Sequence, residues 1–526
     1  MESTMKKTIA LLLVIATFLL ALTGCSAANK NGGANIKDGG ALGSNGSLQT
    51  STALDESLED APSADPDYSY NEDYGKFIEN EFINALQTPV STFSADVDTA
   101  SYAYFRKLVN QGNNLSTMKY VAGTSIRTEE MVNYFKYSYN GPTGADELFG
   151  VNVEISDCPW NKDAKLMKLG LQSEKIEIAS SNNLVFLIDV SGSMNSADKL
   201  GLIKKSFSHL VDKLGEDDRV SIVTYSGKER VVLSGCEGSK HAEIMAAINS
   251  LSAGGSTNGE AGIVKAYQIA EENYITGGNN RIIIASDGDL NVGISSPAEL
   301  EKLISEKKEA GVYLSVLGFG TGNYKDTTME TLADKGNGIY YYIDGEGEAE
   351  RVFGEDLFST LYTIAEDVKL QITFDPEYVS QYRLVGYENR LLNPEDFEND
   401  LKDAGEIGSG HAVTVCYELI LNESAFAEET DWLKLAIRHK NPGEPTSILN
   451  EYNIGYEYFT SAPSSDFEFI CAVIETSMIL HDSKYTVGNT LDSICSRLAE
   501  ISLDGAYDEG QREEFKALVA ALSGRK

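Results

Sequence analysis

The sequence predicts an α/β domain with a doubly wound parallel sheet at residues 183–364. Two segments in this stretch, residues 184–188 and 281–285, are apolar except for Arg281 and are typical of strands that are buried on both faces. An aspartate follows each run closely, Asp189 in the first case and Asp287 in the second. Strand-like and helix-like segments then alternate along the domain. This alternation favours a parallel sheet with helices on both faces.

Before this domain, residues 75–182 are predicted to form a flanking α+β region. A strand is expected near residues 89–94, followed by a helix that begins at Asp98 or Thr99. A second helix is expected to begin at Thr128. Alternating apolar residues predict two further strands, at residues 149–155 and 165–171.

Within the α/β domain, apolar periodicity predicts each element in turn. Helices are expected at residues 202–214, 244–251, 261–274 and 297–310. Besides the two buried runs, strands are expected at residues 219–225, 312–317 and 339–343, with an antiparallel edge strand at 230–233.

After the α/β domain, the sequence predicts a β-rich region at residues 365–465 and a helical region at residues 466–526. The predicted strands are residues 368–374, 382–385, 411–421, 433–438 and 456–459. Two early strands cannot form a stable sheet alone. The strands before the α/β domain are therefore expected to pair with those after it, which makes that domain an insertion.

The N-terminus has the features of a lipoprotein signal peptide, predicted at residues 1–25. Lys6 and Lys7 precede an apolar run that is too short to span a bilayer, and the run ends in Leu-Thr-Gly-Cys25. Cys25 is the expected lipidation site. Residues 26–74 are rich in small, polar and acidic residues and predict a flexible tether. The protein is thus expected to be exported and anchored by lipid to the cell membrane.

The loop after the first buried run carries the candidate metal ligands. Asp189, Ser191 and Ser193 alternate, so a tight turn can direct their three oxygen-bearing side chains at one point beyond the strand. Ligands bind at this end of parallel sheets. Thr257, in a loop that precedes a helix, and Asp287 are the expected fourth and fifth ligands. Such oxygens suit a hard divalent cation, Mg²⁺ first and Mn²⁺ or Ca²⁺ as alternatives.

This ligand pattern resembles the metal-ion-dependent adhesion site of von Willebrand factor type A (VWA) domains. Ser286 stands where relatives commonly have Thr, and regular strand pairing would turn it away from the metal. From about residue 93 to the C-terminus, the sequence also resembles the bacterial YfbK-type VWA lipoproteins. The segments that carry this resemblance are Ser94-Ala-Asp-Val-Asp-Thr-Ala-Ser-Tyr102, Glu129-Glu-Met-Val-Asn-Tyr-Phe135, Pro159-Trp160, Phe319-Gly-Thr-Gly-Asn-Tyr324 and Gly336-Asn-Gly338.

The resemblance implies a binding module in which the metal accepts a carboxylate from a partner protein. A second hypothesis is a structural scaffold of a membrane-associated assembly, in which the metal only makes the loop rigid. A third is a metal-assisted hydrolase, for which a base beside the metal is required. No such base is evident near the motif, so the protein is expected not to be an enzyme.

Charge and cysteine content exclude several other classes of protein. The net charge of -37 argues against a nucleic-acid partner, because a phosphate backbone is bound by Lys and Arg. The sequence contains no Gly-x-x-x-x-Gly-Lys loop for nucleotide phosphates. Five cysteines remain besides Cys25, widely spaced and odd in number. They predict isolated buried thiols rather than a disulfide framework or a zinc site.

Overall fold

A six-stranded sheet forms the α/β domain in the computed structural model. The structure describes residues 78–144, 147–176, 181–256, 258–288, 297–320, 326–356, 362–427, 430–486 and 488–525. The strand order is β10-β9-β8-β5-β6-β7, and all neighbours are parallel except β6 and β7. Their bounds are β5 (Asn182–Asp189), β6 (Arg219–Tyr225), β7 (Arg230–Glu237), β8 (Asn279–Ser286), β9 (Tyr313–Phe319) and β10 (Tyr340–Ile343). The predicted antiparallel edge strand is confirmed.

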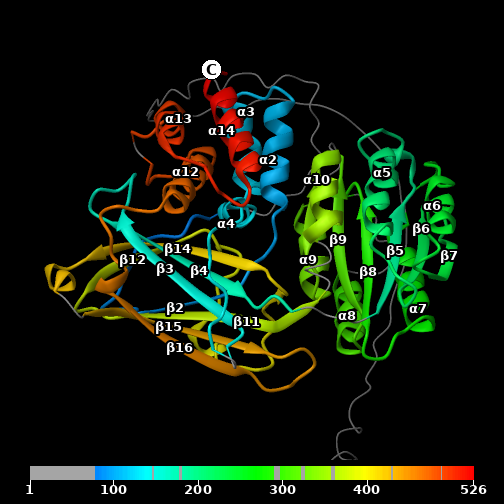
Figure 1. The fold of residues 1–526 in the computed structure, drawn as a ribbon, viewed down its shortest axis with the longest axis horizontal. Helices are drawn as coiled ribbons and strands as arrows, with labels where there is room; N and C mark the ends of the chain where they lie inside the picture. Colours follow the sequence, from blue (N-terminus) through cyan, green and yellow to red (C-terminus); the bar gives the residue numbers. More distant parts are fainter. Residues whose placement is uncertain are drawn as a thin grey trace, which may run out of the picture. The chain divides into compact units, whose positions relative to one another are not determined.

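Helices cover both faces of this sheet, as Figure 1 shows. Val185 and Leu187 of β5 belong to one apolar core, and Phe186 belongs to the other. This division follows the twofold alternation of side chains along a strand. The first core includes α7 (Gly259–Glu272), α8 (Pro297–Glu309) and α9 (Asp326–Lys335), and the second includes α5 (Leu200–Val211), α6 (His241–Asn249) and α10 (Glu346–Arg351). The doubly wound fold is confirmed.

Two antiparallel sheets form a β-sandwich from segments on both sides of the α/β domain. The order of the first is β1-β12-β14-β4-β3, with β1 (Ile83–Asn84), β12 (Val379–Val385), β14 (Ala412–Leu421), β4 (Lys165–Ser173) and β3 (Phe149–Asp157). The order of the second is β13-β11-β15-β16, with β13 (Gly405–Gly408), β11 (Thr363–Phe374), β15 (Asp431–Lys440) and β16 (Ile448–Gly455). Strand β2 (Val90–Ser94) also pairs with β11.

These pairings confirm that the α/β domain is inserted into a discontinuous β region. Strand β4 precedes the domain and pairs antiparallel with β14, which follows it. Strand β2 pairs in the same way with β11. Stacking of Phe374 on Tyr382, with ring centroids 3.9 Å apart, joins the two sheets through their core. Sheet formation therefore requires both halves of the sequence.

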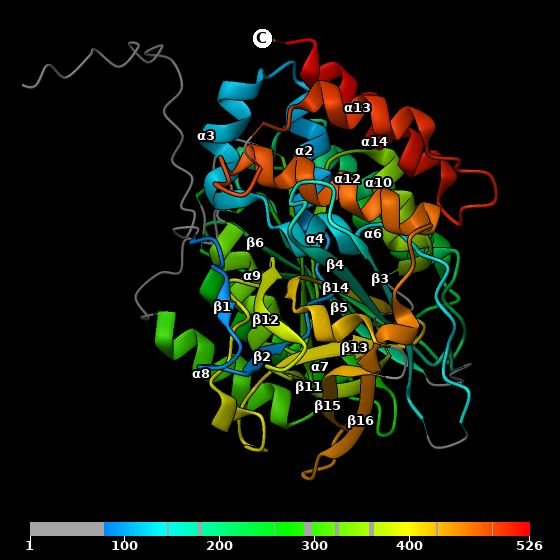
Figure 2. The ribbon, with the colours of Figure 1, turned by 90° about the vertical axis from the view of Figure 1, so that its left-hand side faces the viewer.

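A helical layer built from both ends of the described chain packs beside the sandwich (Figure 2). Tyr102, Phe135, Phe469 and Phe515 form its aromatic core. The helices are α2 (Ala100–Asn110), α3 (Leu115–Ser125), α4 (Thr128–Asn133), α12 (Ser465–Leu480), α13 (Leu491–Glu500) and α14 (Glu509–Ser523). Arg106 of α2 also forms ion pairs with Asp344 and Glu348 of the α/β domain. The predicted helical C-terminus is confirmed.

The strand predicted at residues 456–459 is wrong. Strand β16 ends at Gly455, and Tyr456–Tyr458 forms a 3-10 turn. Phe459 packs edge-to-face on Phe426 outside the ladder. The aromatic residues suggested a strand because of their β propensity. Strand β16 was not predicted because its apolar residues do not alternate: Ile448 and Leu449 are adjacent, and both are exposed.

The predicted burial of the cysteines is confirmed for four of the five that the structure describes. Cys158, Cys236, Cys416, Cys471 and Cys495 are all free thiols, and the first four are buried. In the same residues, no helix has the length and apolar character needed to cross a membrane. The predicted signal peptide with Cys25, the tether at residues 26–74, Thr257 and residues 321–324 of the glycine motif lie outside the described residues.

Candidate metal centre

The loop after β5 brings three of the predicted ligands together. Asp189 is the last residue of β5, and its Oδ1 accepts a hydrogen bond of 2.7 Å from the backbone N–H of Ser191. This bond folds the chain back over the end of the strand. The hydroxyl oxygens of Ser191 and Ser193 then lie 2.9 Å apart. The alternating motif thus places a carboxylate and two hydroxyls at the carboxyl end of the sheet, as predicted.

The fourth described ligand, Asp287, follows β8, which is the neighbour of β5. The two strands are parallel and in register, with Ile188 opposite Ala285, so both end at the same edge. Asp189 and Asp287 are both buried. Burial is the main cause that raises the pKa of Asp189 to about 6, and the charge of Asp287 raises it further. Positive charge beside two buried carboxylates offsets the cost of burying them.

The loop that leads to the fifth predicted ligand is fixed to the first loop. Gly192 donates its backbone N–H to the carbonyl of Gly255 over 3.0 Å, and Gly254 donates to the carbonyl of Val190 over 2.8 Å. Gly255 has a φ of +93°, a left-handed conformation that suits glycine. Asn258 then caps the N-terminus of α7. Thr257, which is outside the described residues, stands between Ser256 and Asn258 in the sequence.

Three further residues contact the predicted ligands, and the sequence did not identify their roles. The Ser286 hydroxyl donates to Asp189 Oδ2 over 3.4 Å, so the expectation that Ser286 turns away from the site is wrong. Gly288 N–H in turn donates to the Ser286 hydroxyl over 3.2 Å. Alternation along β5 and β8 is regular up to Ile188 and Ala285, and its continuation turns Asp189 and Ser286 to the same face of the sheet.

Tyr225 and Lys199 complete the described surroundings. Tyr225 ends β6 opposite Asp189, and burial together with the Asp189 carboxylate raises its pKa. Its position could have been found by aligning the ends of neighbouring parallel strands. Lys199 lies just before α5, and its Nζ is 2.8 Å from Asp287 Oδ2. No periodicity in the sequence indicates this ion pair.

The donor atoms at this edge fit a hard divalent cation. Carboxylate and hydroxyl oxygens are the ligands that Mg²⁺, Mn²⁺ and Ca²⁺ prefer. Asp189, Ser191, Ser193 and Asp287 supply them, with both carboxylates withdrawn from solvent. Two buried acids and two paired hydroxyls lie at this edge of the sheet. Such an arrangement is suited to a cation rather than to an anion.

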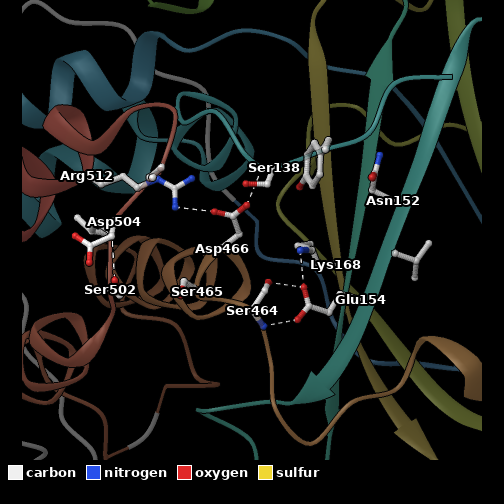
Figure 3. A pocket seen from close by; sticks show the side chains of 15 residues that line it. Ser138, Asn152, Glu154, Lys168, Ser464, Ser465, Asp466, Ser502, Asp504 and Arg512 are labelled. Atoms are coloured by element: carbon white, nitrogen blue, oxygen red, sulfur yellow. Dashed lines mark hydrogen bonds and ion pairs between the residues drawn. The ribbon is translucent and has the colours of Figure 1, made fainter.

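Two other polar features of the described chain contain ion pairs of their own. A cavity of about 390 Å³ between β3, β4 and the helical layer is shown in Figure 3. Its Lys168 pairs with Glu154 over 2.6 Å, and its Arg512 pairs with Asp466 over 2.7 Å. A second feature is a cluster of three acids, Asp367, Asp403 and Glu406. Lysine side chains form ion pairs with two of them, Asp367 and Asp403.

Comparison with known proteins places the whole described chain in one family. Three family models match: "von Willebrand factor" over residues 68–168, "von Willebrand factor type A domain" over residues 183–355 and "Uncharacterized protein YfbK, C-terminal" over residues 359–524. The uncharacterized protein YfbK of Escherichia coli (strain K12) is 40% identical over 477 residues, which cover 86% of this chain and 81% of that protein. The chain belongs to the YfbK family. The resemblance predicted from short motifs is confirmed.

More distant relatives share parts of this YfbK-family chain. Inter-alpha-trypsin inhibitor heavy chain H3 of Mus musculus is 24% identical over 343 residues, covering 61% of this chain and 34% of that protein. Among solved structures, a von Willebrand factor type A protein from Catenulispora acidiphila is similar with a TM-score of 0.40 and 16% identity, covering 73% of this chain and 91% of that one.

Proposed function

We propose that this YfbK-family protein is exported, anchored to the cell membrane by lipid on Cys25, and binds a partner protein through a divalent cation in its VWA domain. The observation that supports this most directly is the convergence of Asp189, Ser191, Ser193 and Asp287 at the carboxyl end of β5 and β8. The VWA family match is consistent with protein binding. The N-terminal sequence supports the lipid anchor.

The ligand set favours a partner that offers a carboxylate. Asp189, Ser191, Ser193, Thr257 and Asp287 would hold the cation, and three of these five side chains are neutral hydroxyls. The bound cation would supply a Lewis-acidic position for an oxygen ligand from outside. An anionic oxygen ligand is preferred over a neutral one, because a carboxylate interacts more strongly with the cation than an uncharged oxygen does.

The same surroundings favour binding over catalysis. A hydrolase needs a general base that can take a proton from water near neutral pH. Tyr225 has its pKa raised by burial, and the Lys199 ammonium is paired with Asp287. Neither of these two neighbours is suited to that role. We therefore propose that the protein is not an enzyme.

The first test is cation binding by the full-length protein in detergent. Isothermal titration with Mg²⁺, Mn²⁺ and Ca²⁺ is expected to show one site in the wild type and loss of that site in Asp189→Asn and Thr257→Ala. Asp217→Asn is the matched control, because Asp217 is exposed and distant from the ligand motif in sequence. Equal binding by all four proteins would contradict the proposed site.

The second test separates adhesion from the scaffold hypothesis. Envelope proteins are captured on wild type and on Thr257→Ala, each with Mg²⁺ and with chelator. Adhesion predicts a partner that is retained only by the wild type with Mg²⁺. A scaffold function through the β-sandwich predicts the same captured proteins in all four conditions. Turnover of ester, peptide or phosphate substrates that depends on Asp189 would favour the hydrolase instead.

A further inference from the structure

Lys199 is built into the edge of the candidate metal centre. Its Nζ lies 2.8 Å from Oδ2 of Asp287, and the Asp287 side chain is fully buried while that of Lys199 is 11% exposed. A salt bridge this withdrawn from solvent differs from an exposed surface pair, because charges interact more strongly where water is excluded. Lys199 therefore acts on the charge of the site itself.

The aliphatic part of Lys199 is fixed by the end of β9. Gly320 follows that strand with a φ of +75°, and a β-carbon at this position would lie 2.2 Å from Lys199 Cε and 2.7 Å from its Cγ. Any other residue at position 320 would displace the lysine. The close approach of a glycine backbone thus guides the ammonium group toward Asp287.

The position of Lys199 has opposite effects on binding of the cation and on binding of a carboxylate ligand. Asp189 and Asp287 carry two negative charges, which a divalent cation alone would neutralise. With Lys199 the loaded site retains one net positive charge, and this charge attracts a carboxylate. The same ammonium group repels the cation and occupies Asp287 Oδ2, so it weakens cation binding.

We propose that Lys199 is a specificity-determining residue that weakens binding of the cation and strengthens binding of an anionic ligand to the loaded site. The proposal rests on the proposed function, because it concerns the same centre. It assigns Lys199 a role outside the five oxygen ligands. A lysine that only stabilised the fold would not affect the two affinities in opposite directions.

The experiment uses the full-length protein in detergent as wild type, Lys199→Met, Lys199→Arg and Lys205→Met. Lys205→Met is the matched control, since it removes the same charge from an exposed position on α5 that pairs with Glu346. Mn²⁺ affinity is measured by isothermal titration. The open coordination position is followed by the longitudinal relaxation rate of water protons at saturating Mn²⁺, while acetate is titrated as the carboxylate probe.

The proposal predicts that Lys199→Met binds Mn²⁺ about tenfold more tightly and needs about tenfold more acetate to displace the bound water. Lys199→Arg, which keeps the charge, and Lys205→Met are expected to stay within about twofold of the wild type. Unchanged affinities in Lys199→Met, or changes in the same direction for both ligands, would overturn the proposal. A wild type that binds no Mn²⁺ would instead refute the proposed function, so the two failures can be told apart.

Discussion

The hydroxyl of Ser286 donates a hydrogen bond to Asp189 Oδ2 from the neighbouring parallel strand, over 3.4 Å. Both residues are buried. A hydrogen bond of this kind holds a ligating carboxylate in one orientation, and loss of such support typically lowers metal affinity by about 10–100-fold. Ser286 therefore belongs to the proposed metal centre although it is not a predicted ligand.

Ser286→Ala is expected to weaken Mg²⁺ and Mn²⁺ binding by at least about tenfold and to leave the fold intact. Ser286→Thr keeps the hydroxyl and should bind within about threefold of the wild type. Isothermal titration measures both affinities, and circular dichroism checks the fold. Equal loss in the two variants would show that the size of the side chain matters here, and not its hydrogen bond.

Lowering the pH is expected to destabilise the folded protein, because His439 binds a proton more readily in the unfolded chain. This residue of β15 is buried, packs edge-to-face on Phe149, and has its pKa lowered by burial to about 4. The unfolded chain binds the proton at a higher pH than the folded one. The contribution of His439 to stability is therefore intact above pH 6.5 and declines as the pH falls toward 4, by about 3 kcal/mol in total.

The measurement is urea unfolding of wild type and His439→Phe between pH 7 and pH 4. The difference in unfolding free energy between the two proteins should shift in favour of His439→Phe as the pH falls. His209→Phe is the control, because His209 lies near the end of α5 and is only partly buried. A difference that is independent of pH would show that His439 does not titrate in this range.

A buried ion pair in the β-sandwich gives a prediction about stability. The Arg383 guanidinium donates from Nε to Glu418 Oε1 over 2.9 Å, and both side chains are at most 1% exposed. Removing one partner leaves the other charge buried, which typically costs about 3–5 kcal/mol, whereas replacing both by apolar residues is often nearly neutral.

Arg383→Met is therefore expected to lower the unfolding free energy by about 3–5 kcal/mol, and Arg383→Met with Glu418→Leu should recover most of it. Thermal unfolding and urea unfolding of the three proteins measure the change. The idea is wrong if the double variant is as unstable as the single one, since the cost would then come from packing and not from the unpaired charge.

Lipidation of Cys25 is tested by Cys25→Ser. Signal cleavage and lipid attachment both depend on this thiol in the predicted pathway, so the variant should leave the membrane fraction or retain its signal peptide. Detergent phase partitioning and mass spectrometry of the N-terminus provide the readout. Partitioning and processing identical to the wild type would rule out Cys25 as the anchor.

The strand-end positions of the candidate ligands could be predicted mainly from local sequence. A buried apolar run fixes where β5 ends, and the alternation of Asp189, Ser191 and Ser193 directs three oxygens to one side. Neighbouring parallel strands then bring Asp287 to the same edge. The first two of these steps follow from the order of residues within one short segment, and the third requires β5 and β8 to be neighbours in the sheet.

Other features depend on contacts between distant segments and carry no local signal. Lys199 reaches Asp287 only because Gly320, at the end of a third strand, makes room for its side chain. The insertion of the α/β domain could be expected because two early strands need partners. The particular register, with Leu171 opposite Val413, results from packing of the sandwich core and had to be observed.

Asp189→Asn should stabilise the metal-free protein while it abolishes stabilisation by metal. The Asp189 carboxylate is fully buried, and burial together with Asp287 raises its pKa to about 6. At pH 7.5 it is ionised in an unfavourable environment. An amide has nearly the same shape and no charge, so the substitution should raise the unfolding free energy in EDTA by about 1–3 kcal/mol. Functional sites commonly carry such a cost.

Mg²⁺ is expected to reverse the order of the two proteins. A ligand that binds only the folded state stabilises it by about 2.7 kcal/mol at a hundred times its Kd. Thermal unfolding at pH 7.5 should therefore show Asp189→Asn as the more stable protein in EDTA and the wild type as the more stable protein in excess Mg²⁺. Asp217→Asn, which changes an exposed acid, should follow the wild type in both buffers. If Asp189→Asn were less stable than the wild type in EDTA as well, the carboxylate would be a structural element of the loop, and the cation would not be what compensates its burial.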